Sequence, residues 1–434
     1  MSVLTSPSPD LSEALPTLNA VTSSFNAYPF ILETSEDHKR RLAYRSLLSF
    51  DVALIVVHLT LLIQATITLG LKLFLRAKNG KIWLWRKHYL LDQAVPYLVP
   101  NGHFIIEPLS IIGAIFFELF SIIVFVVLRN PQIGESLPGL HASCLFWFAV
   151  SWVPGFIGFW WSGWSAFYVL FLTPTHTASS GKYTRLFYHP ILMNTVCIGV
   201  PVLMSIFFII IGAILSSKHK RVGQAYDVLL TSLHQFSDFW KPNDPSRFNN
   251  NEHLFNVFQF ILVEGSQILY LLQIMAVGWA VIAVCIIMFY VATAISVGKV
   301  TQRTMMMAKG RGRFPKFRSQ PTLSMSSLTA SGRHDNVDSK TKADHYPGST
   351  PSYQAGAMKN PSFLNIKRNL YFLRTSCGLM TVSLGFNFCT SLVFANKIPT
   401  LLIETTWQVT LSSLITGSCV LLSFSLFVQS LMHI

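Results

Sequence analysis

Four ionisable side chains lie inside the first two long apolar stretches of this chain. Asp51 and His58 are seven residues apart in one stretch, and Glu107 and Glu118 are eleven apart in the next. On a helix, each spacing puts its two side chains on one face. An isolated carboxylate in hydrocarbon protonates rather than stays charged. We therefore predict that His58 and Glu118, which fall at matching depth, form a pair. Such a pair could hold two helices together, or it could bind a ligand or a proton.

A second candidate site is aromatic. Trp160, Trp161 and Trp164 belong to the sequence WWSGW near the end of the third apolar stretch. Tryptophan collects at membrane interfaces, because its ring is apolar and its N–H is polar. These residues could form such an interface belt or one wall of a ligand cavity.

The sequence lacks the common motifs of enzyme active sites. No two histidines are four residues apart, and the sequence contains no H-E-x-x-H, G-x-S-x-G or Walker loop. The last apolar stretch has no lysine for a retinal Schiff base. We expect no enzyme activity, no metal and no cofactor.

The elements that carry these residues are apolar and long. Hydrophobic residues make up 51% of the chain and charged residues only 12%, which points to lipid as the solvent. A helix needs about 20 apolar residues to cross a bilayer. Seven runs qualify: 47–71, 104–128, 143–171, 191–216, 266–297, 371–395 and 405–431. The predicted fold is an all-α membrane protein, a seven-transmembrane helix bundle.

The distribution of charge predicts the orientation. The net charge of +14 comes from Lys and Arg that sit mainly in loops, where they set topology, so we expect no nucleic-acid partner. Counted near the membrane, these residues favour an N-out, C-in arrangement by roughly two to one. The basic cluster at 39–45 argues the other way.

Four regions follow from this reading. Residues 1–46 form a polar, largely disordered tail, and residues 47–298 hold helices one to five with a long outer loop at 217–265. Residues 299–370 form a disordered, basic, Ser/Thr-rich cytoplasmic loop, and residues 371–434 hold the last two helices. Within the outer loop, residues 252–264 are apolar, which indicates an interfacial or lid helix. We expect any binding cavity to open outward between helices one, two, three and seven, beneath this lid.

The start of the cytoplasmic loop is a candidate contact surface. Its positive charges would bind an acidic signalling protein or anionic lipid, and phosphates added to the nearby Ser/Thr tract would weaken that attraction. The alternative is that these residues only set topology. They are Lys309, Arg311, Arg313, Lys316 and Arg318.

The layout resembles that of G-protein-coupled receptors in helix number, orientation and the basic third cytoplasmic loop. The resemblance is topological only. The third helix ends in FLTPTHTA rather than an acidic-Arg-aromatic triplet, and the last reads LITGSCVLLSF without Asn-Pro-x-x-Tyr. It implies a receptor-like sensing or signalling role for an unknown small ligand. A transporter or channel for a small solute is the alternative, and the sequence leaves open whether the protein lies in the plasma membrane or an endomembrane.

Overall fold

The computed structural model describes residues 11–34, 45–79, 83–89, 94–129, 138–171, 189–241, 244–308, 361–401 and 405–433. The chain divides into two compact units. One contains residues 1–297 and 372–434, and the other contains residues 298–371. The fold below is that of the first unit, which holds the apolar helices.

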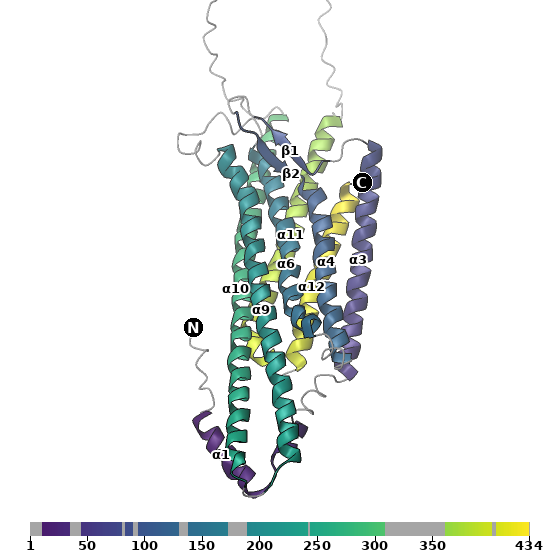
Figure 1. The fold of residues 1–434 in the computed structure, drawn as a ribbon. Coiled ribbons are helices and arrows are strands. Elements are labelled where there is room, and N and C mark those ends of the chain that lie inside the picture. Colours follow the sequence, from purple (N-terminus) through teal and green to yellow (C-terminus); the bar gives the residue numbers. More distant parts are fainter. Residues whose placement is uncertain are drawn as a thin grey trace, which may run out of the picture. The chain divides into compact units, whose positions relative to one another are not determined.

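Eight helices are long enough to define the architecture (Figure 1). Their bounds are α1 Leu11–Ser24, α3 Arg45–Asn79, α4 Gly102–Arg129, α6 Pro138–Phe171, α9 Pro190–Asp238, α10 Ser246–Ala308, α11 Pro361–Leu401 and α12 Thr405–His433. All but α1 contain a stretch that is long and apolar enough to cross a membrane. The described chain is therefore nearly all helical, and its composition is that of a multi-pass membrane protein.

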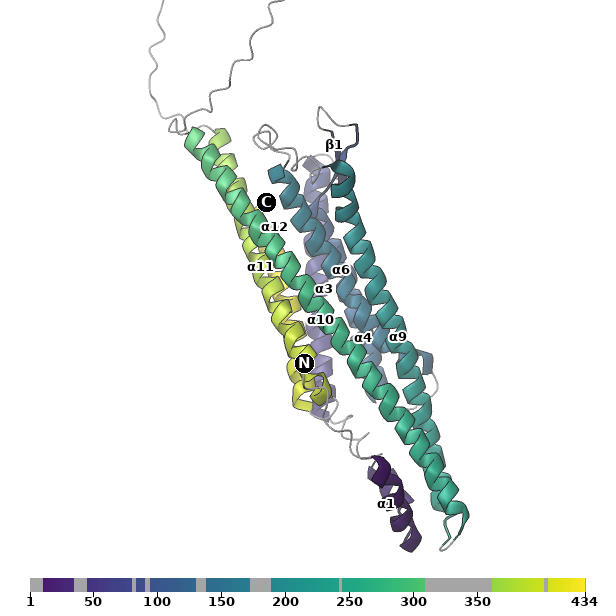
Figure 2. The ribbon, with the colours of Figure 1, turned by 90° about the vertical axis from the view of Figure 1, so that its left-hand side faces the viewer.

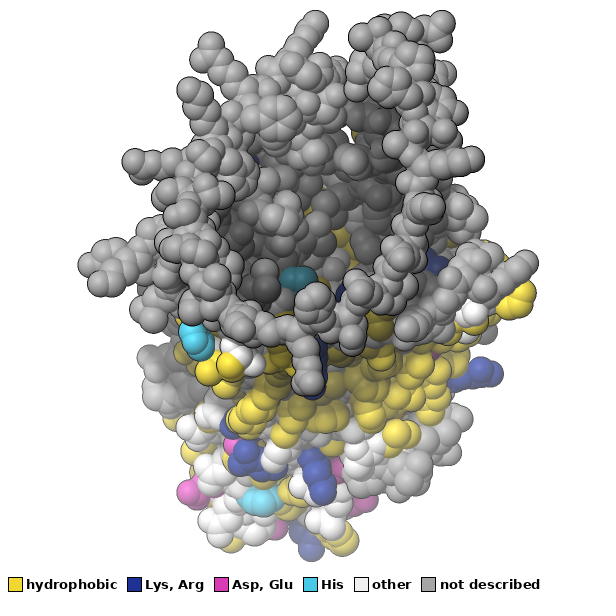
Figure 3. Space-filling model, turned by 90° about the horizontal axis from the view of Figure 1, so that it is seen from above, with side chains coloured by type: hydrophobic (Ala, Val, Ile, Leu, Met, Phe, Trp, Pro, Cys, Tyr) yellow, Lys and Arg dark blue, Asp and Glu magenta, His cyan; other side chains and the backbone are white. Residues whose placement is uncertain are grey.

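The outer surface of these helices is apolar. Large aliphatic and aromatic side chains are exposed along them, for example Ile67 at 65% and Leu203 at 65%. Figure 3 shows such side chains forming a broad band on the described surface. Exposed side chains of this kind are stable only where lipid covers them, which supports a bilayer as the environment.

The centre of the unit is built on α6. Phe156 and Phe159 of this helix are almost fully buried, and Trp152 packs on Trp279 of α10 with ring centroids 5.3 Å apart. Small residues allow the close approach: a Cβ on Gly212 of α9 would lie 3.1 Å from the Cβ of Ala149. The third apolar run is one continuous helix despite Pro154, as the sequence predicts.

By contrast, α3 is loosely held. It packs against α4 and α12. Only 6% of its most apolar stretch is buried, against 56% for α6. Most of α3 therefore faces lipid, and its inner face is the part that can contribute to a site.

The all-α prediction misses one small sheet. Strands β1, Trp85–His88, and β2, Tyr97–Pro100, pair antiparallel between α3 and α4. Asn194 of α9 holds β2 in place, because its amide oxygen accepts a hydrogen bond from the Leu98 N–H and its amide nitrogen donates to the Pro96 carbonyl. We call the end of the bundle with this sheet the hairpin end.

The prediction of a long outer loop at 217–265 is wrong in its secondary structure. Helix α9 continues to Asp238, and α10 begins at Ser246, so most of this region is helical. At 1.5 Å per residue, α9 extends about 33 Å past residue 216. Figures 1 and 2 show the two helices running on together past the other helices. We call residues 217–265 the arm. Residues 252–264 are part of α10 and form no separate lid, because nothing in this sequence breaks the helix.

The prediction of a largely disordered tail is also wrong for residues 11–34. Helix α1 packs on the tip of the arm, where Tyr28 lies in an apolar cluster with Leu233 and Leu254. The buried amide of Asn251 donates to Asn19 Oδ1 and Thr22 Oγ1. It also accepts a hydrogen bond of 2.7 Å from the Tyr28 hydroxyl. These long-range contacts order the segment, and no local pattern signals them.

Candidate functional site

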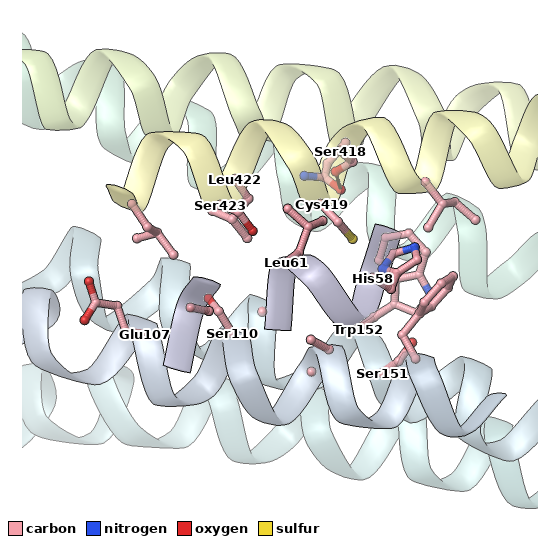
Figure 4. A pocket seen from close by; sticks show the side chains of 18 of the residues that line it. His58, Leu61, Glu107, Ser110, Ser151, Trp152, Ser418, Cys419, Leu422 and Ser423 are labelled. Atoms are coloured by element: carbon pink, nitrogen blue, oxygen red, sulfur yellow. Dashed lines mark hydrogen bonds between the residues drawn. The ribbon is translucent and has the colours of Figure 1, made fainter. Parts of the chain in front are cut away.

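A cavity lies between α3, α4, α6 and α12, which are the first, second, third and seventh apolar helices. Its volume is about 130 Å³. Figure 4 shows side chains from these helices pointing into it. The sequence predicts a cavity between these four helices, and the structure confirms that position. Trp279 of α10 and Asn387 of α11 also line it.

The lining follows helical periodicity. On α3 it uses residues 58, 61, 64, 65 and 68, and on α4 residues 107, 110, 113, 114 and 117. Positions three and four apart share one face of a helix, so each helix presents a single stripe to the cavity. Polar and apolar side chains both line the cavity. On α3, Gln64 and Thr68 lie beside Leu61, and on α12, Ser423 lies beside Leu422.

One end of the cavity is charged. Glu107 is 2% exposed and forms an ion pair with Lys72 of α3. Its paired oxygen also accepts a hydrogen bond of 3.2 Å from the Ser430 hydroxyl of α12. Its other oxygen, Oε2, has no partner among the described residues. Glu107 is five residues from the start of α4, so this end lies toward the hairpin end.

The other end lies near mid-bundle and carries His58. Nε2 of His58 lies 3.0 Å from the Thr416 hydroxyl of α12, and its ring packs on Phe117 of α4 with centroids 4.7 Å apart. His58 is 3% exposed. In Figure 4, Glu107 and His58 lie at opposite ends of the labelled residues.

The predicted His58–Glu118 pair does not form. His58 is paired with Thr416 instead, because α12 packs against α3 at this depth. Glu118 is 6% exposed, and neither carboxylate oxygen has a partner among the described residues. It follows Phe117 directly in sequence but does not line the cavity.

The tryptophans of WWSGW also lie away from this cavity. The indole N–H groups of Trp160 and Trp161 both donate to the Cys197 carbonyl of α9, at 3.0 and 3.1 Å. Trp161 packs edge-on against Trp85 of β1. Trp164 is buried in the same cluster. These side chains pack against α9 and β1 at the hairpin end and do not line the cavity. Their role as an interface belt stays a prediction.

Several functional candidates escaped the sequence reasoning. Trp152 and Trp279 line the cavity, as do Ser418 and Cys419 of α12. For Ser418, the only signal in the sequence is that polar residues recur three or four positions apart in the last helix, which indicates a polar face. Ser418 donates an interhelical hydrogen bond of 2.7 Å to the side-chain oxygen of Asn387 on α11.

Two further predictions have different outcomes. The basic positions 309, 311, 313, 316 and 318 lie outside the described residues, so their contact role stays a prediction. The cavity reaches from mid-bundle toward the hairpin end, and not toward the arm. In the predicted N-out, C-in orientation the hairpin end is the cytoplasmic side. The prediction that the cavity opens outward and the predicted orientation therefore disagree. Within the described ranges, no group of three His, Cys, Asp or Glu residues could hold a metal ion.

Comparison with known proteins supplies no family. No protein-family model matches the sequence, and no curated protein or solved structure is similar to it at a significant level. The function must be argued from the cavity itself.

Proposed function

We propose that this multi-pass membrane protein binds a small, mainly apolar ligand in the cavity between α3, α4, α6 and α12, and that it acts as a receptor-like sensor. The observation that carries the proposal is the cavity, with apolar walls and polar groups at both ends. Ligand sites in helix bundles have this composition: apolar contacts supply affinity, and a few polar groups supply orientation.

The volume limits the ligand. A cavity of about 150 Å³ lined by apolar side chains holds a molecule the size of benzene. A cavity of about 130 Å³ therefore fits a small aromatic or short-chain molecule. A hydroxyl or amine on the ligand could donate to Glu107, and a carbonyl or ether could accept from a serine of α12. Such a molecule can enter from the hairpin end, toward which the cavity extends.

The long helices support signalling. Helix α10 runs without interruption from Ser246 in the arm to Ala308, and Lys309 of the basic segment follows directly. A change in packing around Trp279, which lines the cavity from α10, would act on a helix that ends beside this segment. Basic residues there would contact an acidic partner.

The proposal is tested by ligand-dependent thermal unfolding of the purified protein in detergent. A ligand at 100 times its Kd stabilises the folded state by about 2.7 kcal/mol. Filling the cavity with Ala65→Leu should abolish the shift. The matched control is Ala53→Leu, which adds the same side chain on the exposed side of α3. Equal ligand effects in both variants, or no shift with any member of a small-molecule library, would refute binding at this site.

A transporter for a small solute is the second candidate. The specific observation in its favour is that the cavity extends from mid-bundle toward one end only, as a site with access to one side of the membrane requires. Receptor and transporter differ in one measurement: uptake of the identified ligand into reconstituted vesicles. Uptake supports transport, and ligand-dependent recruitment of a cytoplasmic protein without uptake supports signalling.

A further inference from the structure

Three polar atoms on residues that line the cavity have no hydrogen-bond partner among the described residues. They are the Glu107 carboxylate oxygen Oε2 and the indole nitrogens Nε1 of Trp152 and Trp279. Glu107 is 2% exposed and Trp279 is 5% exposed. A buried donor or acceptor without a partner lowers stability, so such groups are uncommon in folded proteins. A molecule in the cavity that bonded these atoms would remove that cost.

The two donors and the acceptor lie at different heights in the cavity. Helices α4 and α6 pack antiparallel, and a Cβ on Gly113 of α4 would lie 3.3 Å from the Ser151 carbonyl oxygen of α6. Trp152 therefore lies about level with Gly113, which at 1.5 Å per residue is about 9 Å along α4 from Glu107. Trp279 packs on Trp152. In Figure 4, Glu107 lies at one end of the labelled residues and Trp152 lies toward the other.

The acceptor end suits a neutral donor. The other carboxylate oxygen of Glu107 forms the ion pair with Lys72 and accepts a hydrogen bond from Ser430. Lys72 therefore balances the charge of Glu107, which is the only acidic residue among the described residues that line the cavity. A cationic ligand group would be buried there without an anion of its own, which is costly. A hydroxyl or an N–H group can donate to Oε2 without adding charge.

The donor end suits a neutral acceptor. The described lining contains no Lys or Arg, and its one basic side chain, His58, already contacts the Thr416 hydroxyl. A carboxylate or phosphate beside the two indoles would therefore be buried without a balancing cation. A carbonyl oxygen carries no net charge and has two lone pairs, so it can accept from both indole N–H groups.

Between the two ends the walls are apolar, and some of them are flat. Figure 4 shows Leu61 and Leu422 between Glu107 and Trp152. Gly113 and Gly155 also line the cavity, and a Cβ on Gly155 would have no neighbour within 4 Å. Walls of this kind accept a planar ring, and the volume of about 130 Å³ is close to that which holds benzene.

We propose that the cavity binds a neutral aromatic molecule with a hydrogen-bond donor and a carbonyl group on opposite sides of its ring. Glu107 Oε2 accepts from the donor, and the indole N–H groups of Trp152 and Trp279 donate to the carbonyl. The inference rests on the proposed function, because it concerns the same cavity. It adds the class of ligand and the side chains that orient the ligand. Amines and carboxylates that are charged at neutral pH should bind much more weakly.

The test compares three molecules of nearly equal size. 4-Hydroxyacetophenone has both polar groups, 4-ethylphenol lacks the carbonyl, and 4-methylacetophenone lacks the hydroxyl. The Kd is measured from ligand-dependent thermal unfolding of the purified full chain in detergent, at a slightly acidic pH that keeps the phenols neutral. Loss of either group should raise the Kd about tenfold, because each loss leaves a buried group of the protein without a partner. Equal Kd values for the three molecules would overturn the proposal.

Two variants test the donor end. Trp152→Phe and Trp279→Phe keep an aromatic ring but remove the indole N–H. In at least one of them, 4-hydroxyacetophenone should lose its advantage over 4-ethylphenol. Trp147→Phe changes a tryptophan of α6 outside the described lining and should keep that advantage. Because the comparison is made between ligands within each variant, it separates a lost hydrogen bond from a general loss of stability.

A second cavity offers a competing explanation for the indoles. Trp152 and Trp279 also line a space of about 10 Å³, which is room for about one water molecule. If water in that space binds their N–H groups, the advantage of 4-hydroxyacetophenone will persist in both variants, and this result would overturn the proposal.

The outcomes also separate this inference from the proposed function. If the three molecules bind equally and Ala65→Leu abolishes their binding, the cavity is a ligand site without the proposed selectivity. If none of the three binds but other library molecules stabilise the wild type and not Ala65→Leu, the cavity binds another class of ligand. In both cases the inference fails and the proposed function stands. If no molecule stabilises the wild type, both fail.

Discussion

At the tip of the arm, Asn251 is completely buried, and its amide makes hydrogen bonds to Asn19, Thr22 and Tyr28. On α4, Glu118 is almost as deeply buried and makes none with the described residues. Buried polar groups with partners specify a structure, whereas buried polar groups without partners lower stability. The comparison therefore separates a structural network in the arm from a carboxyl group on α4 whose burial calls for another explanation, such as function.

The largest effect is expected from removing the centre of the arm network. Asn251→Ala leaves the Tyr28 hydroxyl and two α1 side chains without their buried partner, which should weaken the docking of α1 by about 3 kcal/mol. Hydrogen exchange in residues 11–34 should then accelerate while the apolar helices stay protected. Unchanged exchange would show that the apolar contacts of Tyr28 alone hold α1.

The Lys72–Glu107 ion pair between α3 and α4 should show the next largest effect. Lys72→Met removes the cation beside Glu107 and leaves a buried carboxylate, so the free energy of unfolding should fall by about 2 kcal/mol. Detergent-induced unfolding measures this change. Lys299→Met, on the exposed side of α10, is the control and should have no measurable effect. An equal loss in both variants would mean that the pair contributes nothing specific.

Replacing Glu118 should change the free energy of unfolding in the opposite direction. Glu118→Leu replaces a carboxyl that lacks partners by an apolar side chain of similar size, so it should raise the free energy of unfolding by about 1–2 kcal/mol. The same unfolding titration reads the gain. A clear loss of stability would show that Glu118 has a partner, and the contrast with Asn251 would then disappear.

The smallest effect concerns the pH dependence of the arm. Burial raises the pKa of Tyr28 above its usual 10.0, although the nearby Arg247 opposes the shift. The neutral hydroxyl is therefore favoured when α1 is docked. This stabilisation is fully present below about pH 10 and is lost as the pH rises through the raised pKa.

Energy transfer between fluorophores on α1 and on the arm should report this release in the wild type. Tyr28→Phe should weaken docking by about 1 kcal/mol at neutral pH and remove the alkaline transition. An alkaline transition that persists in Tyr28→Phe would assign it to another group.

The sequence predicts most of the fold because lipid-facing helices need long apolar runs, and those runs are visible without a structure. It does not predict the arm, since residues such as Leu233 and Leu254 resemble the apolar residues of a loop until the segment around Tyr28 covers them. The position of the cavity on the first two apolar helices is predictable, because His58 and the ionisable residues at helical spacing mark the faces that point inward. The partner of His58 is not, because Thr416 is 358 residues away and one of many threonines.

The position of Glu107 illustrates the same limit. Its helical face can be inferred from the spacing to Glu118, but its pairing with Lys72 depends on how α3 and α4 pack along their lengths. Two apolar helices can slide past each other by a turn with little change in hydrophobic pattern, so periodicity alone cannot fix the register.

The central claim is that a cavity inside the bundle is reached from the hairpin end. Thr68→Cys places a thiol on the cavity wall, and Thr60→Cys places one on the exposed side of the same helix. In reconstituted vesicles of known orientation, a small membrane-impermeant thiol reagent should modify position 68 only when added on the hairpin side, and should not modify position 60 from either side. Modification of position 68 from the arm side, or from neither side, would contradict the account.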